Sequence, residues 1–255
     1  MYITNNRYIN HIDEKGEIHK MIDYSNIDLI EKHLGNKVAI AGRTLGELID
    51  EYESLLAELI IIKHKEAYPD SDTFLPKRLE RAFNWLRSTD FYKAPASTIY
   101  HGSFEGGLLI HSLEVYNNIL TLRTLPQFND CSVASAALIA LVHDWCKIDL
   151  YESYEKNVKN EETGQWEKQK AFRHNQKGVP LGHGTSSMFL AQRIFNNMSI
   201  DELLAIRWHM SSWYVSDSEK NELQLANENY PLVHLLQFAD QLSITQYANN
   251  KLDII

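Results

Sequence analysis

The sequence predicts an all-α helical bundle that carries two small β-hairpins. Apolar residues recur at helical spacing along most of the 255-residue chain, for example at Leu45, Leu48, Tyr52 and Leu55. Two other segments alternate apolar and polar residues on either side of a glycine-containing turn, which is typical of β-hairpins. No internal repeat and no Pro/Gly-rich linker separates the helices. We therefore expect one large helical domain with a small N-terminal addition.

The composition indicates a globular protein of a reducing compartment. Apolar residues at 44% and charged residues at 23% are ordinary for a soluble domain. Two cysteines, Cys131 and Cys146, stand beside 11 histidines, which disfavours a disulfide framework. The first residues lack the apolar core of a signal peptide, and no run approaches the roughly 18 apolar residues of a membrane span. We expect a cytoplasmic protein with no membrane partner.

The N-terminal part is predicted to contain a hairpin followed by a long helix. Residues 8–24 alternate around a turn that contains Gly16, and residues 44–65 carry apolar side chains on one helical face. Pro69 and the polar residues after it are expected to end that helix. His33 and His64 are assigned to exposed helix surfaces.

The main domain is expected to cover residues 76–255, with residues 1–75 packed against it. An inserted hairpin at residues 154–173 interrupts its helices and carries many lysines. The predicted helices are one after Pro76, those at 108–123, 132–145, 201–210 and 232–247, and one that begins near His183.

Five helical segments offer side chains that bind metal ions. One apolar run ends in His143 and Asp144, and burying both groups costs stability unless a partner satisfies them. Neutral imidazole and carboxylate are good ligands for divalent first-row metals. A single histidine on an apolar helix face is more often a hydrogen-bonded core residue than a ligand. Six such positions favour a metal site between facing helices: His111, His143, Asp144, His183, His209 and Asp240.

At these positions the chain resembles the HD-domain metal-dependent phosphohydrolases. The residues that carry the resemblance are Gly-Gly-Leu-Leu-Ile-His-Ser-Leu-Glu-Val at 106–115, Leu-Val-His-Asp-Trp-Cys-Lys at 141–147, Leu-Gly-His at 181–183 and Phe-Ala-Asp at 238–240. The first segment is most similar to the branch that contains HD-type 3′–5′ exoribonucleases and HD regions of conjugative-transfer proteins. The resemblance covers about residues 90–247. It does not explain the two hairpins or the helix at 44–65, and no nucleic-acid-binding barrel is recognisable.

The resemblance implies an HD-type bundle that hydrolyses phosphate mono- or diesters with one or two divalent ions. Manganese, iron, magnesium, cobalt and nickel are all admissible. Related two-metal members often carry a His-rich pair where residues 208–210 of this chain are Trp-His-Met. The implied ligands are His111, His143, Asp144 and Asp240 for the first metal, with Asp144 bridging to a second metal at His183 and His209.

Asp144 and Lys147 are the predicted catalytic residues. A divalent ion can yield hydroxide near neutral pH, and two ions can clamp the attacking and leaving oxygens. On a continuing helix Lys147 would share a face with Asp144, where its ammonium could neutralise phosphoryl charge. Alternatively, Lys147 only complements the dipole at a helix C-terminus. Besides Lys147, the predicted substrate-binding residues are Lys170, Arg173 and His174, which could close over a phosphate.

The charge balance favours a small substrate over a long nucleic acid. The chain has 34 acidic and 25 basic residues, a net charge of −9, whereas a long nucleic-acid track needs a basic face. We expect hydrolysis of a nucleotide, cyclic nucleotide or short oligonucleotide through metal-activated hydroxide. Three alternatives stay open: an exoribonuclease-like nuclease, a catalytically silent nucleotide-binding HD module, and a structural protein whose histidines are buried and hydrogen-bonded.

Overall fold

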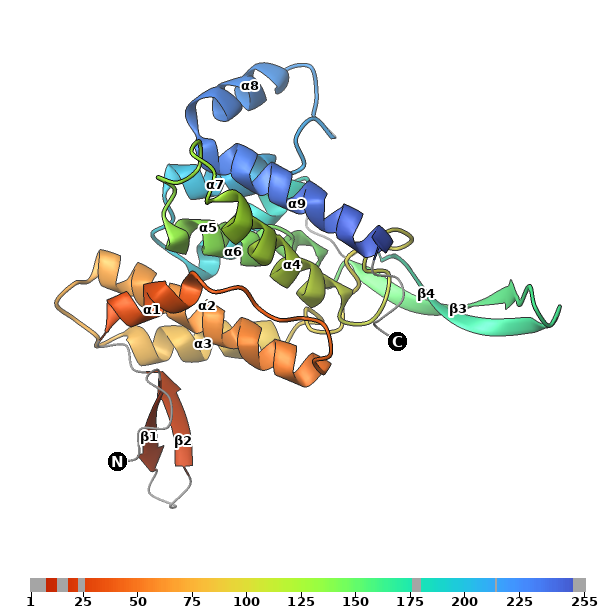
Figure 1. Cartoon of the computed structure of the whole chain (residues 1–255), viewed down its shortest axis with the longest axis horizontal. Coiled ribbons are helices and arrows are strands. Elements are labelled where there is room, and N and C mark those ends of the chain that lie inside the picture. The colour runs from red at the N-terminus through yellow and green to blue at the C-terminus, as the bar shows by residue number, and fades with distance from the viewer. Residues whose placement is uncertain (1–7, 13–17, 23–25, 176–179, 214, 250–255) are drawn as a thin grey trace.

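A computed structural model describes residues 8–12, 18–22, 26–175, 180–213 and 215–249 (Figure 1). These residues are mostly helical and include two antiparallel strand pairs, as predicted. The helices are α1 (Ile27–Leu34), α2 (Leu45–Ala67), α3 (Leu75–Arg87), α4 (Gly107–Leu122), α5 (Val133–Val142), a 3-10 helix η1 (Trp145–Lys147), α6 (His183–Ile194), α7 (Ile200–Trp208), α8 (Lys220–Asn229) and α9 (Pro231–Asn249). The strands are β1 (Tyr8–Ile12), β2 (Ile18–Ile22), β3 (Tyr151–Lys159) and β4 (Trp166–His174).

Helix α5 lies at the centre of the bundle. It is apolar on every side, and its residues from Ala136 to Val142 are all buried. A helix of this kind needs partners around its whole circumference. It packs against α2, α4, α7 and α9, with further contacts to α1 and α6 (Figure 1). The end of α5 therefore lies inside the protein, where His143 and Asp144 follow directly.

Local sequence signals explain where several helices begin. Thr44 starts α2 with a reciprocal capping box to Glu47, and Ser199 does the same for α7 with Glu202. Glu202 is fully buried, and its Oε1 lies 2.7 Å from Lys63 Nζ on α2. The same residue thus caps α7 and fixes it against the long N-terminal helix.

The two hairpins project from the helical body (Figure 1). In the first, β1 pairs with β2 in the register Ile9 opposite Met21, and the predicted turn between them lies outside the described residues. In the second, β3 pairs with β4 over nine residues each, so it is longer than the predicted 154–173. Within the described residues, no helix is both long and apolar enough to cross a membrane.

The long helix α2 shares its core with the rest of the bundle. Buried side chains of α2 such as Leu55 and Leu59 belong to the same hydrophobic cluster as α4, α5 and α9. The division between residues 1–75 and 76–255 stays a prediction.

Some predicted helix limits are wrong by a few residues. The third helix begins at Leu75, so Pro76 lies in its first turn, and α7 ends at Trp208, before His209. Helix α5 ends at Val142 and not at residue 145. Helices α1 and α8 were not predicted. Both are short and polar over much of their length.

The prediction that His33 and His64 are surface residues is wrong. His64 is fully buried, and its Nε2 lies 2.8 Å from Ser71 O. His33 is buried with its Nδ1 2.6 Å from Glu58 Oε2, a carboxylate that is also buried. Polar partners on another segment make burial of these imidazoles possible, and helical spacing alone does not reveal such partners.

Candidate metal centre

The six predicted ligands meet at one place, although they come from five segments of the chain. His111 lies on α4, and Asp240 lies on α9 beside it. His143 and Asp144 follow the end of α5. The remaining two are His183, the first residue of α6, and His209, which directly follows α7.

The first cluster is formed by His111, His143, Asp144 and Asp240. The Nε2 atoms of His111 and His143 are 3.2 Å apart. His111 Nε2 is also 3.2 Å from both Asp144 Oδ2 and Asp240 Oδ1. His143 Nε2 lies 3.5 Å from Asp144 Oδ2 and 3.8 Å from Asp240 Oδ1. Each of the two imidazole nitrogens thus lies within 3.8 Å of both carboxylate oxygens.

The second cluster uses the other oxygen of Asp144. Its Oδ1 lies 2.8 Å from His183 Nε2 and 3.5 Å from His209 Nε2. The donor atoms of His111, His143 and Asp144 are close enough to share an ion, and so are those of Asp144, His183 and His209. These two groups have Asp144 in common. One carboxylate therefore joins two groups of potential ligands through different oxygens.

The histidine tautomers test whether a metal fits these clusters. His143 Nδ1 lies 2.8 Å from Ala140 O, and His209 Nδ1 lies 2.7 Å from Ile206 O. A carbonyl oxygen only accepts, so each Nδ1 carries a proton, and in the neutral form of such a ring Nε2 presents a lone pair. His209 Nε2 is buried without a hydrogen-bond partner among the described residues. A buried lone pair aimed at a carboxylate needs a cation, so these residues fit a metal ion.

His111 is oriented by Ser243, one turn beyond Asp240 on α9. The Ser243 hydroxyl donates to Asp240 O at 2.7 Å. Its oxygen can then accept from His111 Nδ1, which is 3.1 Å away. The ring of His111 is thereby fixed with Nε2 toward Asp144 and Asp240, as in metal sites whose ligands are held by an outer hydrogen bond.

The buried carboxylates of the centre favour a positive charge beside them. Burial opposes charge on His111, yet its hydrogen bonds to Asp144 and Asp240 raise its pKa to about 9. Burial lowers the pKa of His143 to about 3 and also lowers that of His183. Burial works against ionisation of Asp144, but Lys147 and the histidines hold its pKa well below the usual range. With no metal bound, a proton on His111 supplies charge that a metal would replace.

Glycines allow the elements that carry the ligands to approach closely. A Cβ on Gly184 would lie 2.1 Å from Arg207 O, so only glycine lets the start of α6 touch the end of α7. His183 directly precedes Gly184, and His209 stands two residues after Arg207. At the start of α4, a Cβ on Gly107 would lie 2.0 Å from Gly102 O.

A buried tyrosine holds the end of α5 in place. The Tyr52 hydroxyl donates to Leu141 O at 2.7 Å and accepts from Trp145 Nε1 at 3.0 Å. Both contacts flank the His143–Asp144 pair, and all three side chains of Tyr52, Leu141 and Trp145 are buried. Helix α2 therefore positions the central ligands from outside the centre.

Lys147 lies beside Asp144, but not for the predicted reason. The helix does not continue, and η1 brings Lys147 back through a bond from its N–H to Asp144 O at 2.9 Å. Its Nζ lies 2.6 Å from Asp144 Oδ2 and is buried. The ammonium is thus paired with the carboxylate that joins the two clusters.

The other predicted substrate residues lie on the inserted hairpin. Lys170, Arg173 and His174 line a groove of about 460 Å³ between the hairpin and the loop at residues 98–103. Lys170 Nζ is 2.8 Å from Glu105 Oε2, and Arg173 Nε is 2.7 Å from Glu152 Oε1. The ring of His174 packs on Tyr151. These partners are Glu105, Glu152 and Tyr151, and none of them is among the six predicted metal ligands.

Sequence reasoning missed His101 and Ser243. The ring centroid of His101 lies 5.1 Å from that of His111, and burial lowers the His101 pKa to about 4. His101 belongs to the loop at residues 98–103, and Thr98, Ile99 and Ser103 of this loop line the groove. Its spacing of five residues before Gly106 was a signal available in the sequence. Ser243, three residues after Asp240, could have been found from its place on the same helix face.

Comparisons with family models, with curated proteins and with solved structures find no match to this chain.

Proposed function

We propose that this protein is a metal-dependent phosphohydrolase of the HD type that acts on a nucleotide, cyclic nucleotide or short oligonucleotide. The observation that supports this most is Asp144, whose two oxygens face two separate groups of histidine Nε2 atoms. A carboxylate shared in this way suits a pair of divalent ions. Such pairs serve many phosphoryl-transfer enzymes.

The donor set supports the proposal without identifying the metal. Imidazole and carboxylate ligands suit manganese, iron, cobalt and nickel, whereas magnesium prefers oxygen ligands alone. A bound divalent ion would polarise a phosphoryl oxygen and acidify a water molecule. His111, His143, Asp144 and Asp240 would hold the first ion, and Asp144, His183 and His209 the second.

The chain's own residues would orient the substrate and balance its charge. Lys147 can donate to a phosphoryl oxygen next to Asp144 once a metal takes over part of the charge of that carboxylate. His101 lies against His111 and is neutral at ordinary pH, so it offers a hydrogen bond without adding charge. The groove lined by Lys170, Arg173 and His174 would receive the rest of the substrate.

Charge pairing on the hairpin favours a short substrate. The basic side chains of Lys168, Lys170 and Arg173 each have a carboxylate partner within 2.8 Å. These pairs neutralise much of the basic surface that a long strand of RNA would need. We therefore place the exoribonuclease-like activity second.

The test is turnover together with metal content. Purified protein would be supplied with manganese, iron, cobalt, nickel or magnesium and assayed against nucleotides, cyclic nucleotides, short oligonucleotides and a generic aryl phosphodiester. We expect one or two metal equivalents and metal-dependent release of phosphate or of a nucleoside product. Metal binding without turnover of any phosphate ester would indicate a binding module. Absence of both would indicate a structural role for the histidines.

His234→Gln provides a matched control for the ligand variants. His234 lies on α9, the helix of Asp240, and stacks on Phe238 at a ring distance of 5.5 Å. It is not part of either cluster. Loss of activity in His143→Ala with retention in His234→Gln would assign the activity to the centre and not to histidines in general.

A further inference from the structure

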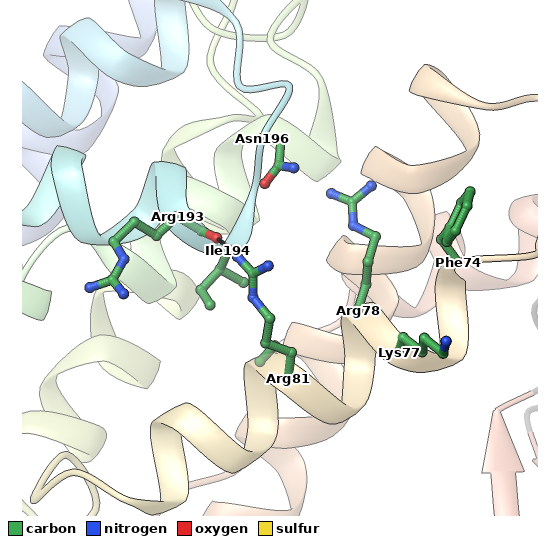
Figure 2. Close-up of a pocket in the computed structure, with 8 residues that line it drawn as sticks. Phe74, Lys77, Arg78, Arg81, Arg193, Ile194 and Asn196 are labelled. Atoms are coloured by element: carbon green, nitrogen blue, oxygen red, sulfur yellow. Dashed lines mark hydrogen bonds between the residues drawn. The ribbon is translucent and has the colours of Figure 1, made fainter.

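A second group of basic side chains lies away from the metal centre. It lines a pocket of about 220 Å³ between α3 and the C-terminal end of α6 (Figure 2). Four basic residues contribute to the described lining, which contains no acidic residue: Lys77, Arg78, Arg81 and Arg193. In a chain with a net charge of −9, such a local concentration of positive charge requires an explanation.

Two of these side chains converge inside the pocket. Arg78 and Arg81 are three residues apart on α3 and therefore share a face of the helix. Figure 2 shows their guanidinium groups and the Asn196 amide facing a common space, whereas the Arg193 side chain points away from it. The convergence of two guanidinium groups and an amide is the feature to be explained.

The Arg78 guanidinium is held on one side and unpaired on the other. His64 Nε2 lies 2.8 Å from Ser71 O and so carries the ring proton, which leaves Nδ1 to accept from Arg78 Nη1 at 3.3 Å. Arg78 Nη2 is buried and has no hydrogen-bond partner among the described residues. Burial lowers the Arg78 pKa; Tyr68 opposes this shift, and the charge of Arg81 adds to it. An unpaired buried guanidinium nitrogen is costly, and an anion would remove that cost.

Arg81 has donors to spare as well. Its Nη2 donates to Arg193 O at 3.0 Å, and no carboxylate is paired with it in the described part of the chain. The carboxylate of Glu66 contacts Asn197, the residue after Asn196, at 3.5 Å, and is already engaged with Lys63 Nζ at 3.0 Å. Two guanidinium groups of like charge therefore face one space without a counter-ion from the protein.

We propose that this pocket binds the phosphate group of a small molecule at a site separate from the metal centre. Guanidinium forks match the paired oxygens of a phosphate, and two of them can clamp one group. Phe74 lines the same pocket with 61% of its surface exposed, so it offers an aromatic face beside the phosphate. Helix α6 separates Arg193 from His183 by ten residues, or about 15 Å at 1.5 Å per residue. A phosphate in the pocket thus cannot touch the metal ligands.

Calorimetric titration of the full-length protein tests the proposal. Inorganic phosphate and adenosine monophosphate are the probes, and the protein is first stripped of metal with a chelator so that the metal centre does not contribute. We expect saturable binding of phosphate that weakens about tenfold in Arg78→Gln and in Arg81→Gln, since each variant removes one charged hydrogen-bonding group. Arg193→Gln is the matched control. It removes one charge from the same lining but none from the converging pair, and we expect unchanged affinity.

Titration with adenosine monophosphate distinguishes a nucleotide ligand from a free phosphate ion. Tighter binding than inorganic phosphate, reduced to the inorganic level by Phe74→Ala, would identify a nucleotide site. Equal binding of both probes would identify a site for the phosphate group alone. Because Arg78 also contacts His64, circular dichroism would verify that Arg78→Gln is folded. Arg81 is exposed and lacks this contact, so Arg81→Gln tests the pocket independently. Absence of saturable phosphate binding, or equal weakening in Arg193→Gln and Arg81→Gln, would overturn the proposal.

Discussion

Asp144 is the residue on which both clusters depend. It is buried and contacts His111, His143, His183, His209 and Lys147 through its two oxygens. We predict that Asp144→Ala loses nearly all bound metal and activity, because each cluster loses its carboxylate bridge. Elemental analysis and circular dichroism would be measured on the same sample. Full metal occupancy in a folded Asp144→Ala protein would contradict the assignment.

Substitution of Lys147 distinguishes a role in catalysis from a role in stability. We predict that Lys147→Ala keeps its metal but lowers kcat by about 10²–10³, as expected when a donor to developing charge is removed. kcat and kcat/KM should fall together, because the interaction belongs to the transition state. Steady-state kinetics at saturating metal would measure both.

The structure adds an alternative for Lys147 that the kinetics can detect. Its ammonium lies 2.6 Å from Asp144 Oδ2, so it also positions that carboxylate. A rise in KM alone would make Lys147 a ground-state binding residue. Loss of metal from Lys147→Ala would show that positioning of Asp144 is its main role.

At the scale of elements, the contact between α6 and α7 sets the second cluster. We predict that Gly184→Ala destabilises the protein by about 1–3 kcal/mol, because a Cβ there would lie 2.1 Å from Arg207 O and the helices must separate. The separation would also move His183 from His209 and weaken binding of the second metal. Denaturant unfolding and metal titration would measure the two effects.

Gly46→Ala is the matched control for Gly184→Ala. Gly46 lies in the first turn of α2, and a Cβ there would have nothing within 4 Å. The same substitution should stabilise the protein there by up to about 1 kcal/mol, because alanine favours the helix. If both variants behaved alike, close approach of α6 and α7 would not be the reason for the glycine.

The elements also show what sequence patterns predict well. Apolar periodicity predicts the helices α2 and α4 and their burial, and the uniformly apolar sequence of α5 predicts its central place. The metal ligands can be predicted because they stand on or beside apolar helices. The turn that brings Lys147 to Asp144 was not predicted, because an i,i+3 bond in η1 replaces the helix without changing the local pattern.

At the scale of the molecule, the missed features depend on tertiary contacts between different helices and loops. Burial of His64 depends on Ser71 and Arg78, and the Arg78–Arg81 pocket depends on where the end of α6 meets α3. His64, Ser71 and Arg78 lie in one stretch of sequence but on different elements, and Arg193, the α6 partner of Arg81, is 112 residues away. Likewise, helical spacing places His111 on a buried face but does not show that His101 packs against it.

The overall charge distribution predicts how kcat/KM depends on salt concentration. A short substrate held by the metals and one to three basic side chains should show a shallow dependence of log(kcat/KM) on log salt, with a slope of about −1 to −2. The paired cations of the hairpin, such as Lys168 with Glu155 at 2.8 Å, contribute little to a longer track. Assays from low to high salt on a dinucleotide and a long RNA would measure both slopes. Processive degradation of the long RNA with a steep slope would favour the exoribonuclease-like activity.

The most direct test of the central claim is anomalous scattering from crystals grown with manganese. We predict a peak bounded by His111, His143, Asp144 and Asp240, and a second peak on the side of Asp144 that faces His183 and His209. Data collected on either side of the manganese absorption edge would identify the element at each peak. A well-ordered crystal with no anomalous peak beside Asp144, at manganese concentrations that saturate the protein in solution, would contradict the metal centre.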